Sequence, residues 1–298
     1  MKKVNLIITD LDDTIWDWLE MWYKSFQPYL INIQKRTGID LAKLKSDFEK
    51  LHQKYNTSEV SFAYNELKTL NKKQKKQIAE EKDKPSIIHQ YYKDKKGNLR
   101  LYDGVIETLS CLRKKKVKIV GYTESNSFYT KYRIKTLGLD GILDIVYTPD
   151  DHGLPPSVKR YYHDGYWESV FTVYNVLPKE SKKPNPNILL KIIKDMGAEI
   201  ENTIYIGDKL DRDIYMANQA CVTSVYAKYG HIINGAPYEL LKEVTHWTDE
   251  EVEREIQFKK KIKDIKINPT VEINNFKEIL SKFEFAELST ENTKETKH

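Results

Sequence analysis

The sequence has few cysteines, no long apolar run and little net charge. Its 298 residues include only Cys111 and Cys221, which lack the spacing of a metal site or a disulfide framework and are expected to be buried. No stretch of about 18 apolar residues occurs, so we expect no membrane-spanning segment. The net charge of +5 is too small to indicate a nucleic-acid partner by itself. Three aspartates follow the first apolar run within thirteen residues, unlike a signal peptide, and we expect a cytoplasmic protein.

Short apolar runs alternate with helical patterns in two parts of the chain. Residues 4–9 are apolar and rich in β-branched side chains, which predicts a buried strand that ends at Asp10. Further strands are predicted at 117–122, 142–147, 203–206 and 222–226. Helices are predicted at 103–115, 127–137, 188–196 and 211–220. This alternation predicts an α/β fold with a doubly wound parallel sheet.

Residues 16–100 have helical rather than alternating spacing. Apolar residues recur every three or four positions in 19–30, 41–51 and 60–67, so we expect four or five helices. We predict that this segment is a separate helical domain inserted into the α/β core, which then consists of residues 1–15 and 101–285.

Three later segments of the chain depart from the alternating pattern. We predict an inserted loop at 149–173, where glycines and prolines gather, and a helical insertion at 230–267 that contains a helix over 238–262. A last strand and helix are expected at 271–273 and 276–283. The tail at 286–298 has no apolar period and is expected to be disordered.

Charged and polar side chains stand where the predicted strands end or a helix begins. They are Asp10, Asp12, Thr123, Lys183, Asp208 and Asp213. Because parallel strands end at one edge of the sheet, these side chains can converge. Clustered carboxylates persist only beside a cation, and an oxygen-only donor set suits Mg²⁺. A metal, a lysine and a hydroxyl around a free carboxylate suit a phosphoryl group, whose phosphorus that carboxylate would attack.

Four motifs follow one another in the same order as in a known superfamily. They are Asp-x-Asp-x-Thr at 10–14, the strand-end Thr123, Lys-Pro-x-Pro at 183–186 and Gly-Asp-x-Leu-x-x-Asp-Ile at 207–214. Together they resemble the haloacid dehalogenase superfamily of aspartyl-phosphate enzymes over about residues 4–228. The resemblance implies that the helical segment between the first two motifs is a type-1 cap.

The resemblance also implies roles in catalysis. Asp10 looks like the nucleophile that becomes an aspartyl-phosphate, and Asp12 looks like the general acid for the leaving group and then the base for water. A spacing of two residues along a strand would place both carboxylates on the same side. Thr123 and Lys183 resemble the donors to the phosphoryl oxygens. Dehalogenases of the superfamily lack the second acid, so the presence of Asp12 favours phosphoryl transfer.

The same resemblance implies a magnesium site. Asp10 and Asp208 would bind Mg²⁺ through their carboxylates, and Asp12 through its backbone carbonyl. Asp213 matches the second acid of the last motif and would be an outer partner of these ligands.

The function expected from these residues is that of a Mg²⁺-dependent phosphomonoester hydrolase acting on a small phosphorylated metabolite. A phosphomutase would use the same residues but exclude water. A phosphatase of nucleic-acid ends and a non-catalytic basic binding module are further alternatives, weakly supported by the net charge of +5. Aromatic platforms beside a basic groove would favour the nucleic-acid interpretation.

Several residues near the motifs have simpler structural interpretations. Asp13 is interpreted as a turn residue, and Asp211 as a helix N-cap or an acid in the first turn of a helix rather than a ligand. Trp16 and Trp18 either pack at the junction with the helical segment or face the substrate. The aromatic residues within 161–167 form either a lid or a small hydrophobic cluster under a loop.

Overall fold

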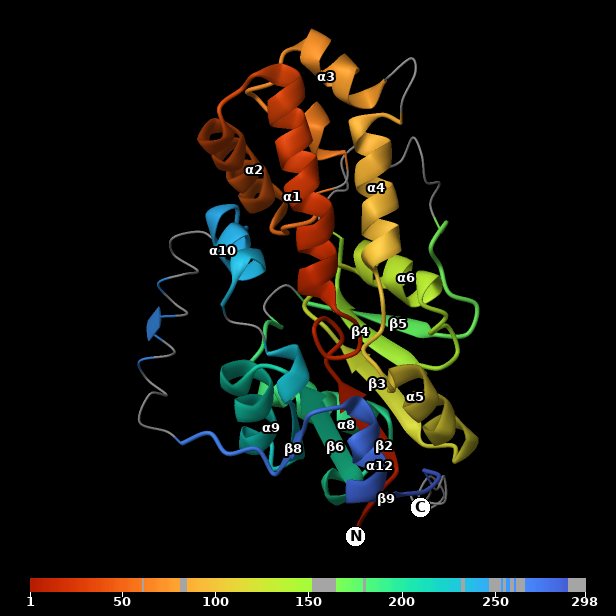
Figure 1. The fold of residues 1–298 in the computed structure, drawn as a ribbon. Helices are drawn as coiled ribbons and strands as arrows, with labels where there is room; N and C mark the ends of the chain where they lie inside the picture. The colour runs from red at the N-terminus through yellow and green to blue at the C-terminus, as the bar shows by residue number, and fades with distance from the viewer. Residues whose placement is uncertain are drawn as a thin grey trace.

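A computed structural model describes residues 1–60, 62–80, 85–151, 165–178, 181–231, 234–246 and 266–288, together with residues 253, 256, 257 and 260. Figure 1 shows a parallel sheet flanked by helices, with a group of longer helices standing on one end of it. The first residues of the chain and residues 283–285 lie at the opposite end. Among the described residues, no helix is both long and apolar enough to cross a membrane.

The main sheet has seven parallel strands in the order β5-β4-β3-β2-β6-β7-β8. The strands are β2 (Leu6–Thr9), β3 (Lys118–Tyr122), β4 (Ile145–Pro149), β5 (Val173–Leu177), β6 (Thr203–Gly207), β7 (Thr223–Ala227) and β8 (Val271–Ile273). The order reverses its direction of growth at β2, so the sheet is doubly wound and the predicted fold class is confirmed. The edge strand β5 is not predicted from the sequence.

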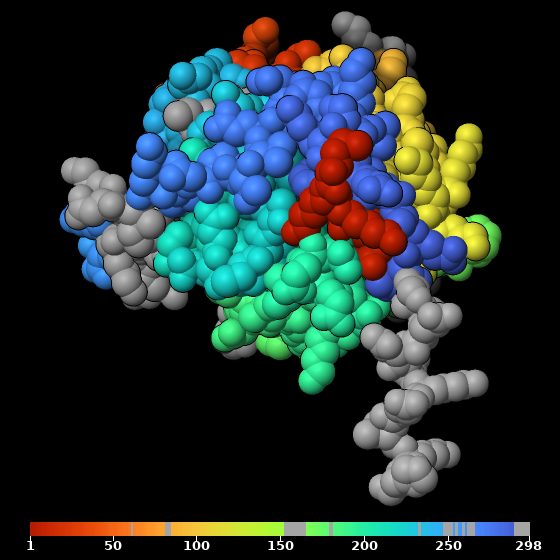
Figure 2. Space-filling model, turned by 90° about the horizontal axis from the view of Figure 1, so that it is seen from below, coloured from red at the N-terminus to blue at the C-terminus, as the bar shows by residue number. Residues whose placement is uncertain are grey.

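The strand predicted at 4–9 is divided in two at Asn5. The Asn5 amide donates to the carbonyl of Asn202 (3.0 Å), while β1 (Lys2–Val4) turns away and pairs with β9 (Phe283–Phe285). Figure 2, which views the molecule of Figure 1 from below, shows the first residues (red) lying beside the last described part of the chain (blue). The helix predicted over 276–283 is shorter, because a 3₁₀ turn (Phe276–Glu278) and α12 (Ile279–Lys282) lead directly into β9.

Helices cover both faces of the sheet and bury alternate residues of its strands. Ile7 packs with α5 (Val105–Lys114) and α12, in one hydrophobic cluster. Leu6 and Ile8 pack on the other face with α8 (Pro186–Asp195) and α9 (Tyr215–Gln219). These two clusters make the sheet a rigid platform whose strand ends all point to the same side.

The longer helices form a region with its own hydrophobic core over the carboxyl ends of the strands (Figure 1). They are α1 (Trp18–Thr37), α2 (Leu41–Tyr55) and α4 (Ile87–Asn98), together with the shorter α3 (Lys72–Ala79). We call residues 16–100 the helical region; that it is a separate domain stays a prediction. Asp17 and Asp40 cap the first two helices by accepting hydrogen bonds from backbone amides.

The helix predicted from the apolar spacing of 60–67 is wrong. The structure has only a 3₁₀ turn (Ala63–Asn65) there, preceded by Phe62 with a φ of +55°. Val60, Phe62 and Leu67 are nevertheless buried in the core of the helical region. The spacing therefore reports burial at this point rather than helical backbone.

Two chain crossings join the helical region to the sheet, side by side. Trp16 forms a bridge with Leu101, and the amide of Tyr102 donates to the carbonyl of Ile15 (3.1 Å). A third element, α10 (Ala236–Glu243), comes from the C-terminal part of the chain and packs against α1 and α2. The helix predicted over 238–262 is thus interrupted, since α10 ends at Glu243; most of 247–265 lies outside the described residues.

The two cysteines, the inserted loop and the C-terminal tail were also predicted from the sequence. Cys111 is half-buried, whereas Cys221 is exposed in a turn with a φ of +57°, so the expectation that both are buried is wrong. Residues 152–164, which include most of the predicted inserted loop and part of its aromatic group, and the tail at 289–298 lie outside the described residues.

Candidate active site

The first two candidate acids stand on a loop just beyond β2. The strand ends at Thr9, and the amide of Asp10 still donates to the carbonyl of Ile206 on β6 (2.8 Å). The chain then turns around the buried Leu11, whose carbonyl accepts from the amide of Ile15 (2.8 Å). Asp12 therefore lies outside the strand, and strand alternation does not decide where its carboxylate points relative to that of Asp10.

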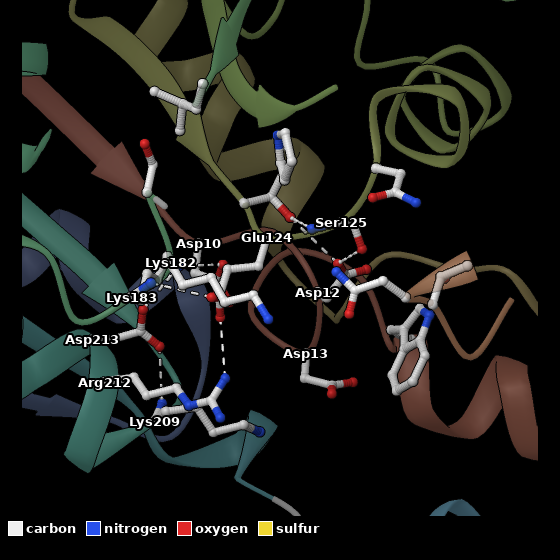
Figure 3. A pocket seen from close by; sticks show the side chains of 18 of the residues that line it. Asp10, Asp12, Asp13, Glu124, Ser125, Lys182, Lys183, Lys209, Arg212 and Asp213 are labelled. Atoms are coloured by element: carbon white, nitrogen blue, oxygen red, sulfur yellow. Dashed lines mark hydrogen bonds and ion pairs between the residues drawn. The ribbon is translucent and has the colours of Figure 1, made fainter. Parts of the chain in front are cut away.

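A cavity of about 500 Å³ opens at the carboxyl ends of the strands, between the sheet and the helical region. All six candidate residues named from the sequence line it: Asp10, Asp12, Thr123, Lys183, Asp208 and Asp213. Figure 3 shows Asp10, Lys183 and Asp213 grouped on one side and Asp12 with Ser125 on the other. The strand ends thus bring together residues that are up to 203 positions apart in the sequence.

Lys183 is buried between two carboxylates. Its Nζ lies 2.6 Å from Asp10 Oδ1 and 2.9 Å from Asp213 Oδ1. Asp213 is fixed further by the hydroxyl of Tyr205 (2.7 Å) and the amide of Lys209 (3.1 Å). A β-carbon on Gly207 would lie 2.4 Å from the Asp213 carboxyl carbon, so only glycine lets this carboxylate approach β6 so closely.

Asp208 is nearly fully buried at the end of β6. It forms an ion pair with Lys209, and the hydroxyl of Thr14 lies 3.5 Å from its Oδ1. Carboxylate oxygens of Asp10, Asp208 and Asp213 all lie within 4.8 Å of one another. Oxygen ligands at this spacing fit a hard cation such as Mg²⁺.

These groups carry more negative than positive charge. We call Asp10, Asp13, Lys183, Asp208, Lys209 and Asp213 the strand-end cluster, in which four carboxylates face two ammonium groups. Burial raises the pKa of Asp10 well above its usual range against the opposing effect of Lys183, and burial likewise raises the pKa of Asp13 to about 7 and that of Asp208 to about 8. A bound cation would favour the charged carboxylates and oppose these shifts, so the donor set fits a metal site.

Asp12 has a different set of partners. Its Oδ1 accepts from the indole N–H of Trp16 (2.6 Å) and lies 3.2 Å from the guanidinium of Arg133. Its Oδ2 accepts from the hydroxyls of Ser125 (2.5 Å) and Thr123 (3.4 Å). Trp16 is fully buried, so its side chain packs at the junction and does not face the cavity.

A second group of buried charges joins the cavity to the helical region. Glu59 forms ion pairs with Arg133 on α6 (Ser127–Thr136) and with Lys95 on α4 (2.7 Å), and it accepts from the indole N–H of Trp18 (2.8 Å). We call Glu59, Lys95, Arg133 and Asp12 the seam cluster. Burial would raise the pKa of Glu59, but Arg133 and Lys95 outweigh it and lower that pKa to about 2.

The sequence alone did not identify the seam cluster. Glu59, Lys95 and Arg133 come from three separate segments, and each is one charge among many on a lysine-rich chain. No motif spacing connects them. Trp18 lines the cavity as well, so of the two tryptophans at the junction this one can face a ligand.

Other residues around the cavity have structural roles. Asp213 was expected to be an outer partner of metal ligands; one of its carboxylate oxygens lies within 4.8 Å of those of both Asp10 and Asp208. Asp211 stands in the first turn of a π-helix (Leu210–Ile214), as expected. Asp13 has a φ of +57°, in agreement with a turn residue, but it is also buried and lines the cavity.

Comparison with known proteins identifies related sequences and folds. The model of the haloacid dehalogenase-like hydrolases matches residues 4–220. A glyceraldehyde 3-phosphate phosphatase of Pyrococcus furiosus is 24% identical over 232 residues, which are 77% of this chain and 83% of that protein. A glyceraldehyde 3-phosphate phosphatase of Methanopyrus kandleri is 39% identical over only 49 residues, and the match spans 21% of that protein and 16% of this chain.

Solved structures resemble the chain over most of its length. A predicted phosphoglycolate phosphatase from Haemophilus somnus 129PT has a TM-score of 0.48 and 15% identity, and the match covers 94% of this chain and 97% of that one. A phosphatase from Thermococcus onnurineus has a TM-score of 0.46 and 20% identity, covering 82% and 99%. Because both scores are below 0.5, membership of a family rests on the match to the family model.

Proposed function

This chain belongs to the haloacid dehalogenase-like hydrolase family, and we propose that within it the protein is a Mg²⁺-dependent phosphomonoester hydrolase that forms an aspartyl-phosphate on Asp10. The observation that carries the proposal is the buried carboxylate of Asp10 with Lys183 2.6 Å away and Asp208 and Asp213 beside it. The names of the two curated relatives support a phosphomonoester as the substrate. They make glyceraldehyde 3-phosphate the first ester to assay.

The metal site would use the oxygens nearest the nucleophile. Asp10 and Asp208 would bind Mg²⁺ through their carboxylates, Asp12 would bind through its backbone carbonyl, and Asp213 would hold the ligands in place. When bound, the ion supplies positive charge to the phosphoryl oxygens and to the carboxylates around them. Lys183 and Thr123 would donate to the remaining phosphoryl oxygens.

The first half of the reaction transfers the phosphoryl group to the protein. A carboxylate oxygen of Asp10 forms a bond to phosphorus while the bond from phosphorus to the ester oxygen breaks. Asp12, protonated in this half, gives its proton to the departing ester oxygen, so that an alcohol leaves.

The second half returns the protein to its starting state. Asp12, now a carboxylate, takes a proton from a water molecule, whose oxygen forms a bond to phosphorus. The bond between phosphorus and Asp10 breaks, which releases inorganic phosphate and restores the carboxylate of Asp10. Atoms and charge balance over the two halves, since the proton given to the alcohol is replaced by one from water.

The alternatives differ in observable products. A phosphomutase would move the phosphoryl group to a second hydroxyl and release little inorganic phosphate. Seven carboxylate side chains line the cavity against four from lysine and arginine, which is unfavourable for a polyanionic nucleic-acid end. A binding module without activity would turn over no phosphomonoester with or without Mg²⁺.

The proposal is tested by trapping the acyl phosphate. Wild-type protein, Mg²⁺ and a phosphomonoester should give an acid-stable, base-labile phosphoenzyme and inorganic phosphate. Asp10→Asn should abolish both, with a loss of activity on the order of 10⁴-fold or more. Asp211→Asn, on the same side of the molecule, is the matched control and should keep the phosphoenzyme. An Asp10→Asn variant that retains activity, after deamidation and contamination are excluded, contradicts the assignment.

A further inference from the structure

Arg133 is a fully buried cation that the proposed chemistry does not use. It extends from α6 and contacts two carboxylates, Asp12 Oδ1 at 3.2 Å and Glu59 through an ion pair. Its NH1 also lies 3.3 Å from the hydroxyl of Ser125. A buried guanidinium with its planar fork divided between two carboxylates fixes the position of each relative to the other.

The two oxygens of Asp12 meet different kinds of donor. Oδ1 faces the indole N–H of Trp16 and the guanidinium of Arg133, which can only donate. Oδ2 faces the hydroxyls of Ser125 and Thr123, which can donate or accept. A carboxyl proton on Oδ2 can therefore be donated to a hydroxyl and keeps the hydrogen bonds of Asp12. A proton on Oδ1 would face N–H donors and lose a hydrogen bond.

The partners of the two Asp12 oxygens also differ in where they lie. Trp16 and Arg133 are fully buried and are absent from the cavity lining, whereas Ser125 and Thr123 are part of it. Oδ1 thus faces the interior of the protein, and Oδ2 faces the space where a leaving group would stand. In the protonated acid, a rotation that exchanged the two oxygens would turn the O–H toward these N–H donors and lose a hydrogen bond, so the proton is held on the side of the cavity.

We propose that Arg133, together with Trp16, is a positioning residue that holds Asp12 with Oδ2 toward the leaving group. This inference rests on the proposed function of Asp12 as the general acid. Since Glu59 of the helical region holds the other side of Arg133, the orientation of Asp12 depends on contact between the helical region and α6. The helical region thereby acts on proton transfer through Trp16 and, by way of Glu59, through Arg133, and both contact Oδ1 rather than Oδ2.

The test compares esters that differ in their need for protonation. Arg133→Lys keeps the charge but cannot contact both carboxylates with a planar fork, and Trp16→Phe removes only the N–H donor. With an alkyl phosphate, each should lower kcat/KM by about 100-fold, as expected for a misplaced catalytic group. With an aryl phosphate, whose leaving group needs little protonation, the loss should be several-fold at most. Arg113→Lys, at an arginine that pairs with Asp144 outside the cavity (2.8 Å), is the matched control.

A background without the general acid separates positioning from general stability. In Asp12→Asn protein, Trp16→Phe and Arg133→Lys should cause little further loss, because the group that they position is gone. Equal losses for the two esters, or full additive losses in the Asp12→Asn background, overturn the inference while the proposed function stands. Trp16→Phe alone decides the result if Arg133→Lys does not fold. A wild-type protein that hydrolyses neither ester overturns the proposed function first, and this inference with it.

Discussion

The strand-end cluster and the seam cluster are both largely buried, but their charges are arranged differently. In the strand-end cluster four carboxylates face two lysines, and the pKa values of Asp10, Asp13 and Asp208 are raised, chiefly by burial. In the seam cluster two carboxylates face an arginine and a lysine, and the pKa of Glu59 is lowered to about 2. Burial is common to both, so the balance of charge decides the direction of the shift.

The balance of charge in a buried cluster distinguishes a site that binds a ligand from one that is structural. A cluster that neutralises itself is complete without a ligand and holds segments of the chain together. A cluster with an excess of one sign is complete only when a ligand of the other sign binds. Asp12 lies between the two, since it lines the cavity and also contacts Arg133.

Among the variants that distinguish the two clusters, Asp12→Asn should have the largest effect on activity. Asp12→Asn should fold and lower turnover of alkyl phosphates by roughly 10²–10⁴-fold, because an amide neither gives nor takes the proton. Steady-state kinetics with an aryl and an alkyl phosphate measure the effect. A smaller loss with the aryl ester is expected, and equal losses with both would show that Asp12 belongs only to the structural cluster.

Removal of a carboxylate from the balanced cluster should destabilise the protein. Glu59→Gln leaves Arg133 and Lys95 buried without their shared partner, which should lower the free energy of unfolding by about 3–5 kcal/mol. Urea unfolding measures the change. The control is Glu66→Gln, because Glu66 pairs with the exposed Lys54, where solvent screens the charges and the change should be small. Similar changes for the two variants would remove the distinction drawn for the seam cluster.

Removal of a carboxylate from the unbalanced cluster should affect metal binding instead. Asp208→Asn should raise the Mg²⁺ concentration for half-maximal activity on the order of 100-fold, while KM for the ester changes much less. Its free energy of unfolding without metal should not fall as that of Glu59→Gln does, because a like-charge repulsion is relieved. Asp195→Asn, at an exposed pair with Lys191, is the control. Unchanged activation by Mg²⁺ would place the metal elsewhere.

The smallest effect is expected at His52, a buried residue of α2. Burial lowers the pKa of His52 to about 4 from 6.5, and its Nδ1 lies 2.7 Å from the carbonyl of Val244. The unfolded chain takes up a proton near pH 6.5 and the folded protein only near pH 4, so stability is complete above pH 6.5 and falls on acidification. Between pH 7.5 and 5 the loss should be about 2 kcal/mol greater in wild type than in His52→Gln. Urea unfolding at the two pH values measures it, and parallel curves would contradict the shift.

The sequence predicts four of the six members of the strand-end cluster, because their signals are local; Asp13 was interpreted as a turn residue, and Lys209 was not singled out. Asp10, Lys183 and Asp208 each stand in a short motif at the end of a predicted strand or the beginning of a helix, and parallel strands end at one edge. The seam cluster depends on how the helical region packs on α6, which no local pattern encodes. Glu59 lies in a non-helical segment, and Lys95 resembles the lysines that surround it in sequence.

The fold was predictable to the extent that burial and periodicity agree. They agree in the central strands, which are buried on both faces. They disagree around Phe62, where apolar residues are buried by a turn, and at β5, an edge strand with exposed valines such as Val173 and Val176. The division at Asn5 results from the pairing of β1 with β9. Because β9 lies near the other end of the chain, no local sequence pattern indicates this pairing.

The position of α10 has a consequence for modularity. Leu240 and Val244 belong to the hydrophobic core of the helical region, although the chain reaches them only after the last motif. The C-terminal part also supplies His246, which lines the cavity and shares a hydrogen bond with Ser58 (2.9 Å). Residues 16–100 therefore do not form the core of the helical region by themselves. A chimaera that exchanges them with another family member must exchange 236–246 at the same time, because otherwise the donor's helices meet a helix shaped for different partners.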